Sequence, residues 1–203
     1  MLRIRLLKLI LNSMKIFSYI FLFTLLLSSC NSNSKSNKEI SESSIFNLTS
    51  EWENQDAEKL QLKDLQGKTL VVVMIFTTCK SACPILVAKM RGIEEKISRK
   101  DIDKVSLVLV SIDPETDTPE NLKKFAKKNN MDAPQWIFLR STEAATQEFA
   151  NVLSMKYKRI SPIDFSHSNI ISVFNEGGDL VSQEEGNIQI DDVVATVNKT
   201  IKK

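Results

Sequence analysis

Cys79 and Cys83 are the residues of this sequence whose type and spacing most directly predict chemistry. Three residues separate them, and they stand between an apolar run and the stripe of an amphipathic helix. Residues i and i+4 share a face of a helix, so two thiolates at this spacing can converge on one soft metal ion. Soft sulfur ligands select Cu(I). A redox couple, a structural disulfide and two buried inert cysteines are the alternatives that the spacing leaves open.

The position of the pair at a helix start favours a reactive role over a structural one. Backbone N–H groups at a helix N-terminus stabilise a thiolate, which raises both its nucleophilicity and its affinity for metals. A structural disulfide would gain little here, because the loop that it closes is short. The spacing also differs from the Cys-x-x-Cys of thioredoxin-type redox pairs.

His167, the one histidine of the chain, is the candidate for a third ligand. Two sulfurs can hold Cu(I) linearly, and a third ligand would shield and tune it. His167 stands in the stretch IDFSHSNII, in a predicted loop just before an apolar strand. The alternative is a hydrogen-bonded surface histidine. The residue types thus make Cys79, Cys83 and His167 candidate ligands of a soft metal ion such as Cu(I), and the alternatives above stay open.

The elements that must position these residues alternate between strands and helices. Continuous apolar runs predict buried strands over 69–76, 105–112 and 135–140. A hairpin is predicted over 169–183, because Gly177-Gly178 supplies its turn chemistry.

Helical signals follow each of these strands. The first helix is indicated by the stripe Leu86, Met90, Ile93 and Ile97. Thr118 and Pro119 are expected to be the N-cap and first residue of the second helix. Ser141 is expected to cap a third helix, with Val152 among its inward residues, and an apolar stripe predicts a last helix near the C-terminus.

This order of elements predicts an α/β sandwich with a central mixed sheet, flanking helices, and a C-terminal hairpin and helix. The cysteine pair lies where the first long strand gives way to its helix. In open α/β sheets the carboxyl ends of the strands are where sites are built.

The amino terminus, MLRIRLLKLILNSMKIFSYIFLFTLLLSSC, predicts a secretory signal. Basic residues precede an apolar core over 16–27, which is shorter than the roughly 20 residues that span a bilayer. The tetrad Leu27-Ser28-Ser29-Cys30 resembles the bacterial lipobox, which implies cleavage before Cys30 and a lipid on its sulfur. The alternative is an uncleaved membrane anchor. Both interpretations place the rest of the chain outside the cytoplasm.

Three segments are therefore expected: a lipoprotein signal (1–29), a lipidated cysteine with a flexible tether (30–44) and one folded domain (45–203). The Ser/Asn-rich tether cannot bury enough surface to offset its ordering entropy. The signal holds four basic residues and no acidic one, so the rest of the chain has 23 basic and 25 acidic side chains. A nucleic-acid surface needs a concentrated basic face, so no nucleic-acid partner is expected.

Three separated stretches resemble the SCO/SenC proteins, copper chaperones of cytochrome c oxidase assembly with a thioredoxin-like fold. FTTCKSACP (76–84) is similar to the cysteine segment of that family. VSIDPETDTPENLKKFA (110–126) resembles its Asp-Pro and Asp-Thr-Pro stretch, and SHSNIISVFNEGGDLV (166–181) its histidine strand with the following glycine turn. DLQGKTLVVV (64–73) matches the usual approach to the first core strand. The resemblance spans nearly all of the predicted exported domain.

The resemblance implies that Cys79, Cys83 and His167 are ligands of copper, as Cu(I) or Cu(II), and that Asp113 and Asp117 are loop residues near the site. The residues alone support a plainer interpretation of the two aspartates. Asp113 ends a strand, and Asp117 can accept a backbone N–H near the next helix start. Neither is expected to bind Cu(I) directly, because carboxylate oxygen suits harder ions.

The chain departs from the family pattern beside the proposed ligands. Lys80, Ser81 and Ala82 stand where members commonly have proline and aspartate, and Ser166 stands where an acidic residue usually precedes the histidine. Lys80 would favour a thiolate at its neighbour, and the missing carboxylates make the site less negative.

The predicted function is a copper metallochaperone that delivers copper to the copper A site of a respiratory cytochrome c oxidase. Its partner is expected to be subunit II of the oxidase or another copper-receiving protein. The chaperone is expected to be a monomer without enzymatic activity of its own, anchored through Cys30 on the extracytoplasmic side of the inner or outer membrane.

The alternative function is an extracytoplasmic thiol–disulfide oxidoreductase that acts on the cysteines of the oxidase or of another partner. Cys79 and Cys83 would then be its redox pair. A peroxidase of the same broad fold is disfavoured, because residues 74–78 lack the proline expected before a peroxidatic cysteine.

Overall fold

The computed structural model describes residues 40–79, 82–161 and 164–202. The predicted signal, Cys30, Lys80 and Ser81 lie outside the described residues, and Cys83 is described by its helical backbone alone. The chain divides into two units, of which Glu39–Lys203 holds the fold described below. Within the described ranges, no helix combines the length and the apolar character needed to cross a membrane.

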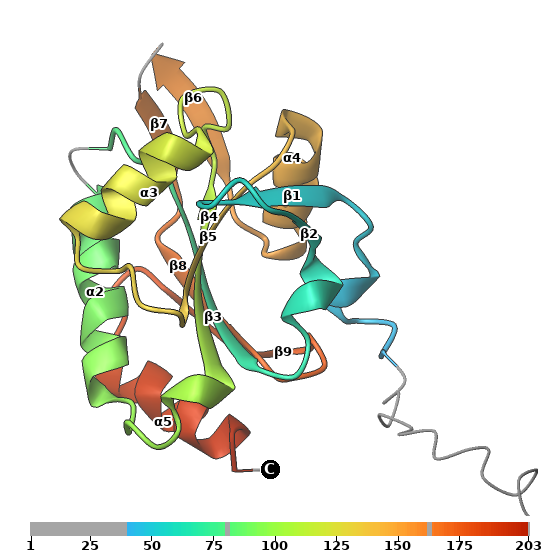
Figure 1. Cartoon of the computed structure of the whole chain (residues 1–203), viewed down its shortest axis with the longest axis vertical. Coiled ribbons are helices and arrows are strands. Elements are labelled where there is room, and N and C mark those ends of the chain that lie inside the picture. The colour runs from blue at the N-terminus through green and yellow to red at the C-terminus, as the bar shows by residue number, and fades with distance from the viewer. Residues whose placement is uncertain (1–39, 80–81, 162–163, 203) are drawn as a thin grey trace, which may run out of the picture. The chain divides into compact units, whose positions relative to one another are not determined.

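A seven-stranded mixed sheet forms the centre of this unit (Figure 1). Its strands are β1 (Glu51–Asn54), β2 (Lys59–Gln61), β3 (Thr69–Ile75), β4 (Val105–Ser111), β5 (Trp136–Arg140), β8 (Ile170–Phe174) and β9 (Leu180–Glu185). They lie in the order β2-β1-β5-β4-β3-β8-β9. β3, β4 and β5 are parallel to one another, whereas β1, β2, β8 and β9 pair with their neighbours in antiparallel fashion.

The central strands β3 and β4 are buried along their whole length, as their continuous apolar sequences predict. They pair in parallel from Thr69 with Val105 to Ile75 with Ser111. Both strands therefore end at the same edge of the sheet. The strands predicted at these positions and at β5 agree with the structure to within a residue at each end.

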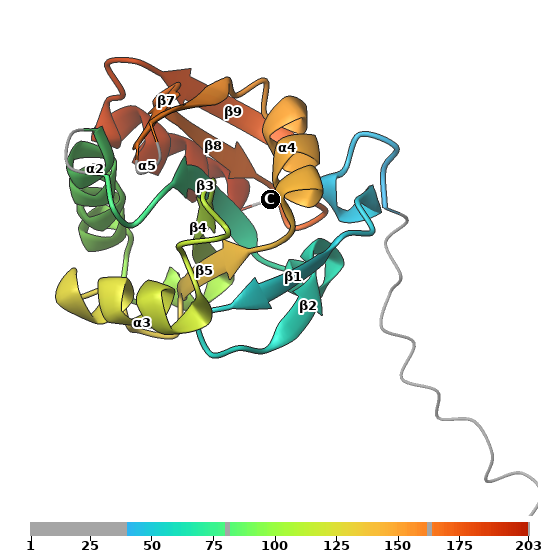
Figure 2. The same cartoon turned by 90° about the horizontal axis from the view of Figure 1, so that it is seen from above.

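In the described part of the chain, four α-helices cover the sheet: α2 (Ala82–Lys96), α3 (Pro119–Lys128), α4 (Glu143–Val152) and α5 (Ile190–Thr200). Figure 2 shows α2, α3 and α5 over one face and α4 over the other. Short 3-10 helices lie in the connections, at η1 (Ile45–Asn47), η2 (Leu62–Leu65) and η3 (Ile102–Lys104). The predicted α/β class, with a mixed sheet between helices, is confirmed.

The start of α4 differs from the prediction. Thr142, not Ser141, is the N-cap, and its hydroxyl accepts a hydrogen bond from the backbone N–H of Ala145. Ser141 instead donates to the carbonyl oxygen of Glu51, which fastens the end of β5 to β1. The predicted burial of Val152 is wrong: it is the last residue of the helix and is 46% exposed.

A second, two-stranded sheet was not predicted. It consists of β6 (Tyr157–Ser161) and β7 (Asp164–His167), an antiparallel hairpin that is not part of the central sheet. Figure 1 shows this hairpin at the end of the sheet where β3 gives way to α2. The hairpin carries the only histidine of the chain.

The described chain begins against the turn that joins β8 to β9. Residues 40–44, the described part of the segment predicted as a tether (30–44), pack on this turn. The Ser44 hydroxyl donates to the carbonyl oxygen of Gly177 at 2.6 Å. Gly178 has a φ of +82°, and a Cβ there would lie 2.7 Å from the ring of Phe46 and against the Ser44 hydroxyl. A glycine is therefore needed for both the turn and the close approach.

Candidate metal site

The candidate site lies at the edge of the sheet where β3 and β4 end. Ile75 and Ser111 are the last paired residues of these strands. Two segments therefore leave the sheet next to each other: the cysteine loop, residues 76–79, and the aspartate loop, residues 112–117. This carboxyl edge is where parallel α/β sheets place their binding sites.

The two cysteines do not share a helix. Cys79 closes a turn of the cysteine loop, because its backbone N–H donates to the carbonyl oxygen of Phe76 at 3.3 Å. Its partly buried side chain packs against the hydrophobic core. The helix α2 begins at Ala82, so Cys83 is its second residue and Cys79 precedes it. The predicted placement of both thiols on one helical face is therefore wrong, and their convergence on one ion stays a prediction.

His167 is the last residue of β7, opposite Tyr157 of β6. Its ring contacts Phe76 edge-on, with the ring centroids 5.9 Å apart and the planes at 81°. Nδ1 lies 3.1 Å from the carbonyl oxygen of Ser168. Because a carbonyl oxygen only accepts, a neutral imidazole that makes this hydrogen bond carries its proton on Nδ1 and its lone pair on Nε2. Metal-binding histidines are held in this way, with one ring nitrogen donating to a carbonyl or carboxylate.

Phe76 connects two of the predicted ligands. Its carbonyl oxygen fixes the turn at Cys79, and its fully buried ring contacts His167. The fold thus brings the histidine of β7 to the cysteine loop. Among the described side chains, no three histidine, cysteine, aspartate or glutamate residues form a metal-binding group; the thiol of Cys83 is not one of those side chains.

Asp117 fastens the aspartate loop to the cysteine loop. Its fully buried carboxylate accepts from the backbone N–H of Thr77, at 3.2 Å from each oxygen, and from the Thr77 hydroxyl. The Ser111 hydroxyl donates a further bond at 2.6 Å. Burial raises the pKa of Asp117, and the hydrogen bonds from Ser111 and Thr77 partly oppose that rise. The N–H donor thus belongs to the cysteine loop and not, as the sequence suggested, to the next helix start.

Asp113 is also buried, with 1% of its surface exposed. Its backbone carbonyl accepts from the N–H groups of Thr116 and Asp117, at 3.1 and 2.9 Å, and so shapes the aspartate loop. Its Oδ1 accepts from Nη2 of Arg159 at 3.1 Å, whereas its buried Oδ2 has no hydrogen-bond partner in the described structure. Both aspartates therefore hold loops beside the candidate site. That they lie near the metal without binding Cu(I) directly stays a prediction.

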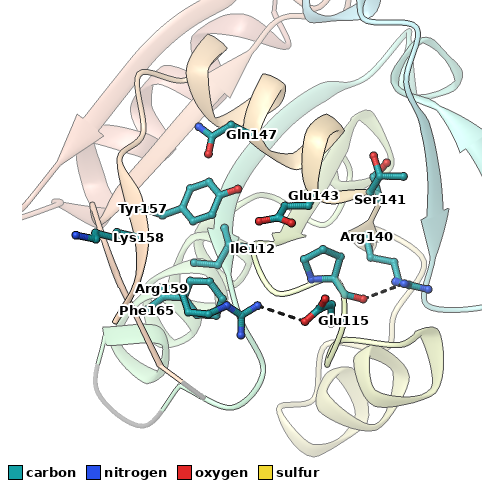
Figure 3. Close-up of a pocket in the computed structure, with 12 residues that line it drawn as sticks. Ile112, Glu115, Arg140, Ser141, Glu143, Gln147, Tyr157, Lys158, Arg159 and Phe165 are labelled. Carbon is teal, nitrogen blue, oxygen red and sulfur yellow. Dashed lines mark hydrogen bonds and ion pairs between the residues drawn. The ribbon is translucent and has the colours of Figure 1, made fainter. Parts of the chain in front are cut away.

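A pocket of about 380 Å³ lies beside the hairpin (Figure 3). It is bounded by the hairpin, the start of α4 and the aspartate loop, and its lining includes Tyr157, Phe165 and Glu143. Burial, and then the charge of Glu143, raises the pKa of Tyr157. Cys79 and His167 are not among the lining residues. The pocket is therefore a neighbour of the candidate site and not the site itself.

The residues that support the predicted ligands, above all Thr77, Arg159 and Phe165, could not be recognised from the sequence. The signal for the hairpin is an alternation: in YKRIS (157–161) and DFSH (164–167), every second residue falls on the same face of a strand. The signal is weak because each strand is short and mixes basic with aromatic side chains.

Comparison with known proteins relates this arrangement to one family. The SCO1/SenC family model matches residues 36–202. A SCO1 protein homolog of Bacillus subtilis (strain 168) is 35% identical over 100 residues, which are 49% of this chain and 51% of the relative. The matches span about half the length of most of the curated relatives.

Solved structures share the fold. BsSco, a member of the Sco family of cytochrome c oxidase assembly proteins in which a disulfide switch was identified, is 26% identical with a TM-score of 0.66, covering 75% of this chain and 91% of its own. ScoI of Arabidopsis thaliana, with copper bound, is 23% identical with a TM-score of 0.67, covering 75% and 95%. These structures confirm the predicted thioredoxin-like fold.

Proposed function

The chain belongs to the SCO1/SenC family, and on this premise we propose that it is a copper metallochaperone. It binds one copper ion through Cys79, Cys83 and His167 and delivers it to the copper A site of a respiratory cytochrome c oxidase. The observation that carries the proposal is the contact of the His167 ring with Phe76, the residue whose carbonyl holds the turn at Cys79. The copper bound to Arabidopsis ScoI and the oxidase-assembly role of BsSco support the choice of metal and partner.

The three proposed ligands, two cysteine sulfurs and one histidine nitrogen, are of the types that bind copper. Two sulfurs and one imidazole nitrogen are soft or borderline ligands, which favour Cu(I) over the hard ions that prefer oxygen. The Nδ1 hydrogen bond of His167 leaves Nε2 with the lone pair that a metal needs. Asp117 is occupied by hydrogen bonds within the protein, so it holds the cysteine loop in place and does not compete for the metal.

Transfer requires a site that a partner can reach. Cys79 and His167 are both only partly buried. A partner thiol or imidazole can therefore replace the ligands one at a time, so that copper passes through mixed-ligand intermediates and is never released into water. The fully buried ring of Phe76 excludes water from the inner side of His167 during this exchange.

The partner is subunit II of the oxidase or another copper-receiving protein, and the chaperone acts as a monomer. The lipobox-like tetrad that ends at Cys30 supports a lipid anchor on the extracytoplasmic side of the inner or outer membrane. Such an anchor would hold the chaperone on the membrane that carries the oxidase or on the one facing it.

Competition for Cu(I) tests the proposal. The full chain with Cys30→Ser, in which Cys79 and Cys83 are the remaining thiols, is reduced and titrated anaerobically against a chromophoric chelator. We expect one tightly bound copper per chain, and a sharp loss of affinity in each single ligand replacement. A triple replacement of Cys79, Cys83 and His167 that binds copper as tightly as the parent would refute the proposal.

A thiol–disulfide oxidoreductase is the second candidate, and the disulfide switch of BsSco favours it. One cysteine would attack a partner disulfide and the other would resolve the mixed disulfide, so that the partner is reduced as the pair becomes oxidised. His167→Ala discriminates between the two functions. It should leave reductase turnover intact if the chain is a reductase, and should remove high-affinity copper binding if the chain is a chaperone.

A further inference from the structure

We propose that Arg159 is a positioning residue of the copper site, which holds the β6–β7 hairpin so that His167 stays against the cysteine loop. The inference rests on the proposed copper site and adds to it a residue that does not touch copper. Arg159 lies in β6. Its guanidinium donates a hydrogen bond to Asp113 of the aspartate loop and stacks on the ring of Phe165 in the hairpin.

The register of the hairpin places Arg159 and His167 on one face. Tyr157 pairs with His167, and Arg159 pairs with Phe165. Directly opposite residues share a face of an antiparallel pair, and so do residues two apart on one strand. Phe165 and His167 thus lie next to each other, and both of their rings contact Phe76, at centroid distances of 5.1 and 5.9 Å.

Arg159 joins this face to the aspartate loop. Its guanidinium carbon lies 4.5 Å from the centre of the Phe165 ring, within the range of a cation–π interaction. Nη2 donates to Oδ1 of Asp113 at 3.1 Å and lies 3.7 Å from a carboxylate oxygen of Glu115. Figure 3 shows the guanidinium beside Phe165 and directed at Glu115. One side chain therefore spans from the hairpin to the loop that follows β4.

The hairpin needs such a fastening because its strands do not pair with the central sheet. A two-stranded hairpin is only marginally stable by itself, so side-chain contacts decide how closely β7 stays against the cysteine loop. The Arg159 side chain is 41% exposed, but its Asp113 partner is 1% exposed, and a charge-assisted bond to a buried carboxylate is stronger than a surface ion pair. Without this bond, His167 would have to be ordered when copper binds, and affinity would fall.

A double-mutant cycle on Cu(I) affinity tests the inference in the full chain with Cys30→Ser. Arg159→Gln removes the charge and the stacking, and Lys158→Gln is its matched control. Lys158 is the neighbouring residue of β6, pairs across the hairpin with Ser166, and points away from Arg159 (Figure 3). Arg159→Gln should weaken Cu(I) binding roughly 10- to 100-fold, as the loss of a ligand's supporting partner typically does. Lys158→Gln should leave the affinity unchanged.

The second arm of the cycle repeats Arg159→Gln in a His167→Ala background. Because Arg159 acts through the imidazole, it should have no further effect once the imidazole is gone. An equal loss in both backgrounds, or an affinity for Arg159→Gln equal to that of Lys158→Gln, overturns the inference while the copper site stands. If His167→Ala itself leaves the affinity unchanged, the proposed three-ligand site fails first.

Two more variants keep the test decisive where Arg159→Gln does not fold. Asp113→Asn keeps the shape of the buried side chain and removes the charge that anchors Arg159, so it should reproduce the loss of affinity. Arg159→Lys keeps the charge, so it should recover part of the affinity. Full wild-type affinity in Asp113→Asn contradicts the inference.

Discussion

At the scale of single residues, the buried carboxylate of Asp117 links the chemistry of the site to its folding. It accepts hydrogen bonds from Thr77, two residues before Cys79, and from Ser111 at the end of β4. These bonds hold the cysteine loop where His167 can reach it through Phe76. The arrangement has a cost, because a carboxylate charge is being kept out of water.

The pH dependence of unfolding should reveal that cost. Burial raises the pKa of Asp117 above its ordinary value of 3.8. The folded state then binds a proton more tightly than the unfolded state, so this contribution to stability is fully present below pH 3.8 and is lost as the pH rises through the folded pKa.

Asp117→Asn should remove this loss. Urea unfolding of the parent and of the variant, measured from about pH 3.5 to pH 7, compares their unfolding free energies. The stability of the parent relative to the variant should fall as the pH rises. A constant difference between the two over this range would show that Asp117 does not titrate as we expect.

At the scale of elements, the turn between β8 and β9 holds the described start of the chain. Gly178 permits the close approach of Ser44 and Phe46, and Gly186, after β9, has a similar positive φ of +75° with no atom near its missing Cβ. The two glycines therefore form a matched pair.

Alanine at either glycine meets the backbone strain of a positive φ, roughly 1–2 kcal/mol. Only Gly178→Ala also meets the overpacking against Phe46, typically about 1–3 kcal/mol. We expect Gly178→Ala to be the less stable of the two variants by about that second amount, measured by chemical denaturation. Equal losses would mean that the segment around Ser44 and Phe46 adjusts freely and does not form part of the core.

The elements that could be predicted from the sequence are the strands that are buried at every residue and the helix start with a clear N-cap. β3 and β4 read as continuous apolar runs because both of their faces are covered, and the N-cap at Thr118 was predicted because its hydroxyl is followed by a proline at the first helical position. The outer strands β2 and β1 and the β6–β7 hairpin escaped prediction because each strand is short and none is buried along its whole length.

The ligand candidates could be named from residue type, whereas the residues that hold them could not. Cys79 and His167 stand out as rare side chains. The roles of Thr77 and Arg159 depend on partners far along the chain, since Thr77 bonds to Asp117 and Arg159 to Asp113. Contacts between residues so far apart in the sequence leave no local sequence pattern from which they could be predicted.

At the scale of the whole molecule, the candidate site and the described start of the chain lie at opposite ends of β8. His167 precedes this strand, and the turn that receives Ser44 follows it. The described part of the chain therefore enters the domain at the end of β8 away from the candidate site.

Lipidation itself can be tested by labelling. Cells that express the full chain and are fed an alkyne-bearing fatty acid should yield a labelled protein, and Cys30→Ala should abolish the label because the thioether sulfur is gone. Cys79→Ala is the control that keeps Cys30. Persistent labelling of Cys30→Ala, or an unlabelled parent, would contradict the lipid anchor.

The most direct test of the proposed copper site is X-ray absorption at the copper edge of the Cu(I)-loaded chain with Cys30→Ser. We expect one copper with two sulfur neighbours and one imidazole nitrogen, and the loss of that nitrogen in His167→Ala. A copper shell that is the same with and without His167, or that lacks two sulfurs, would contradict the site on which the proposed function rests.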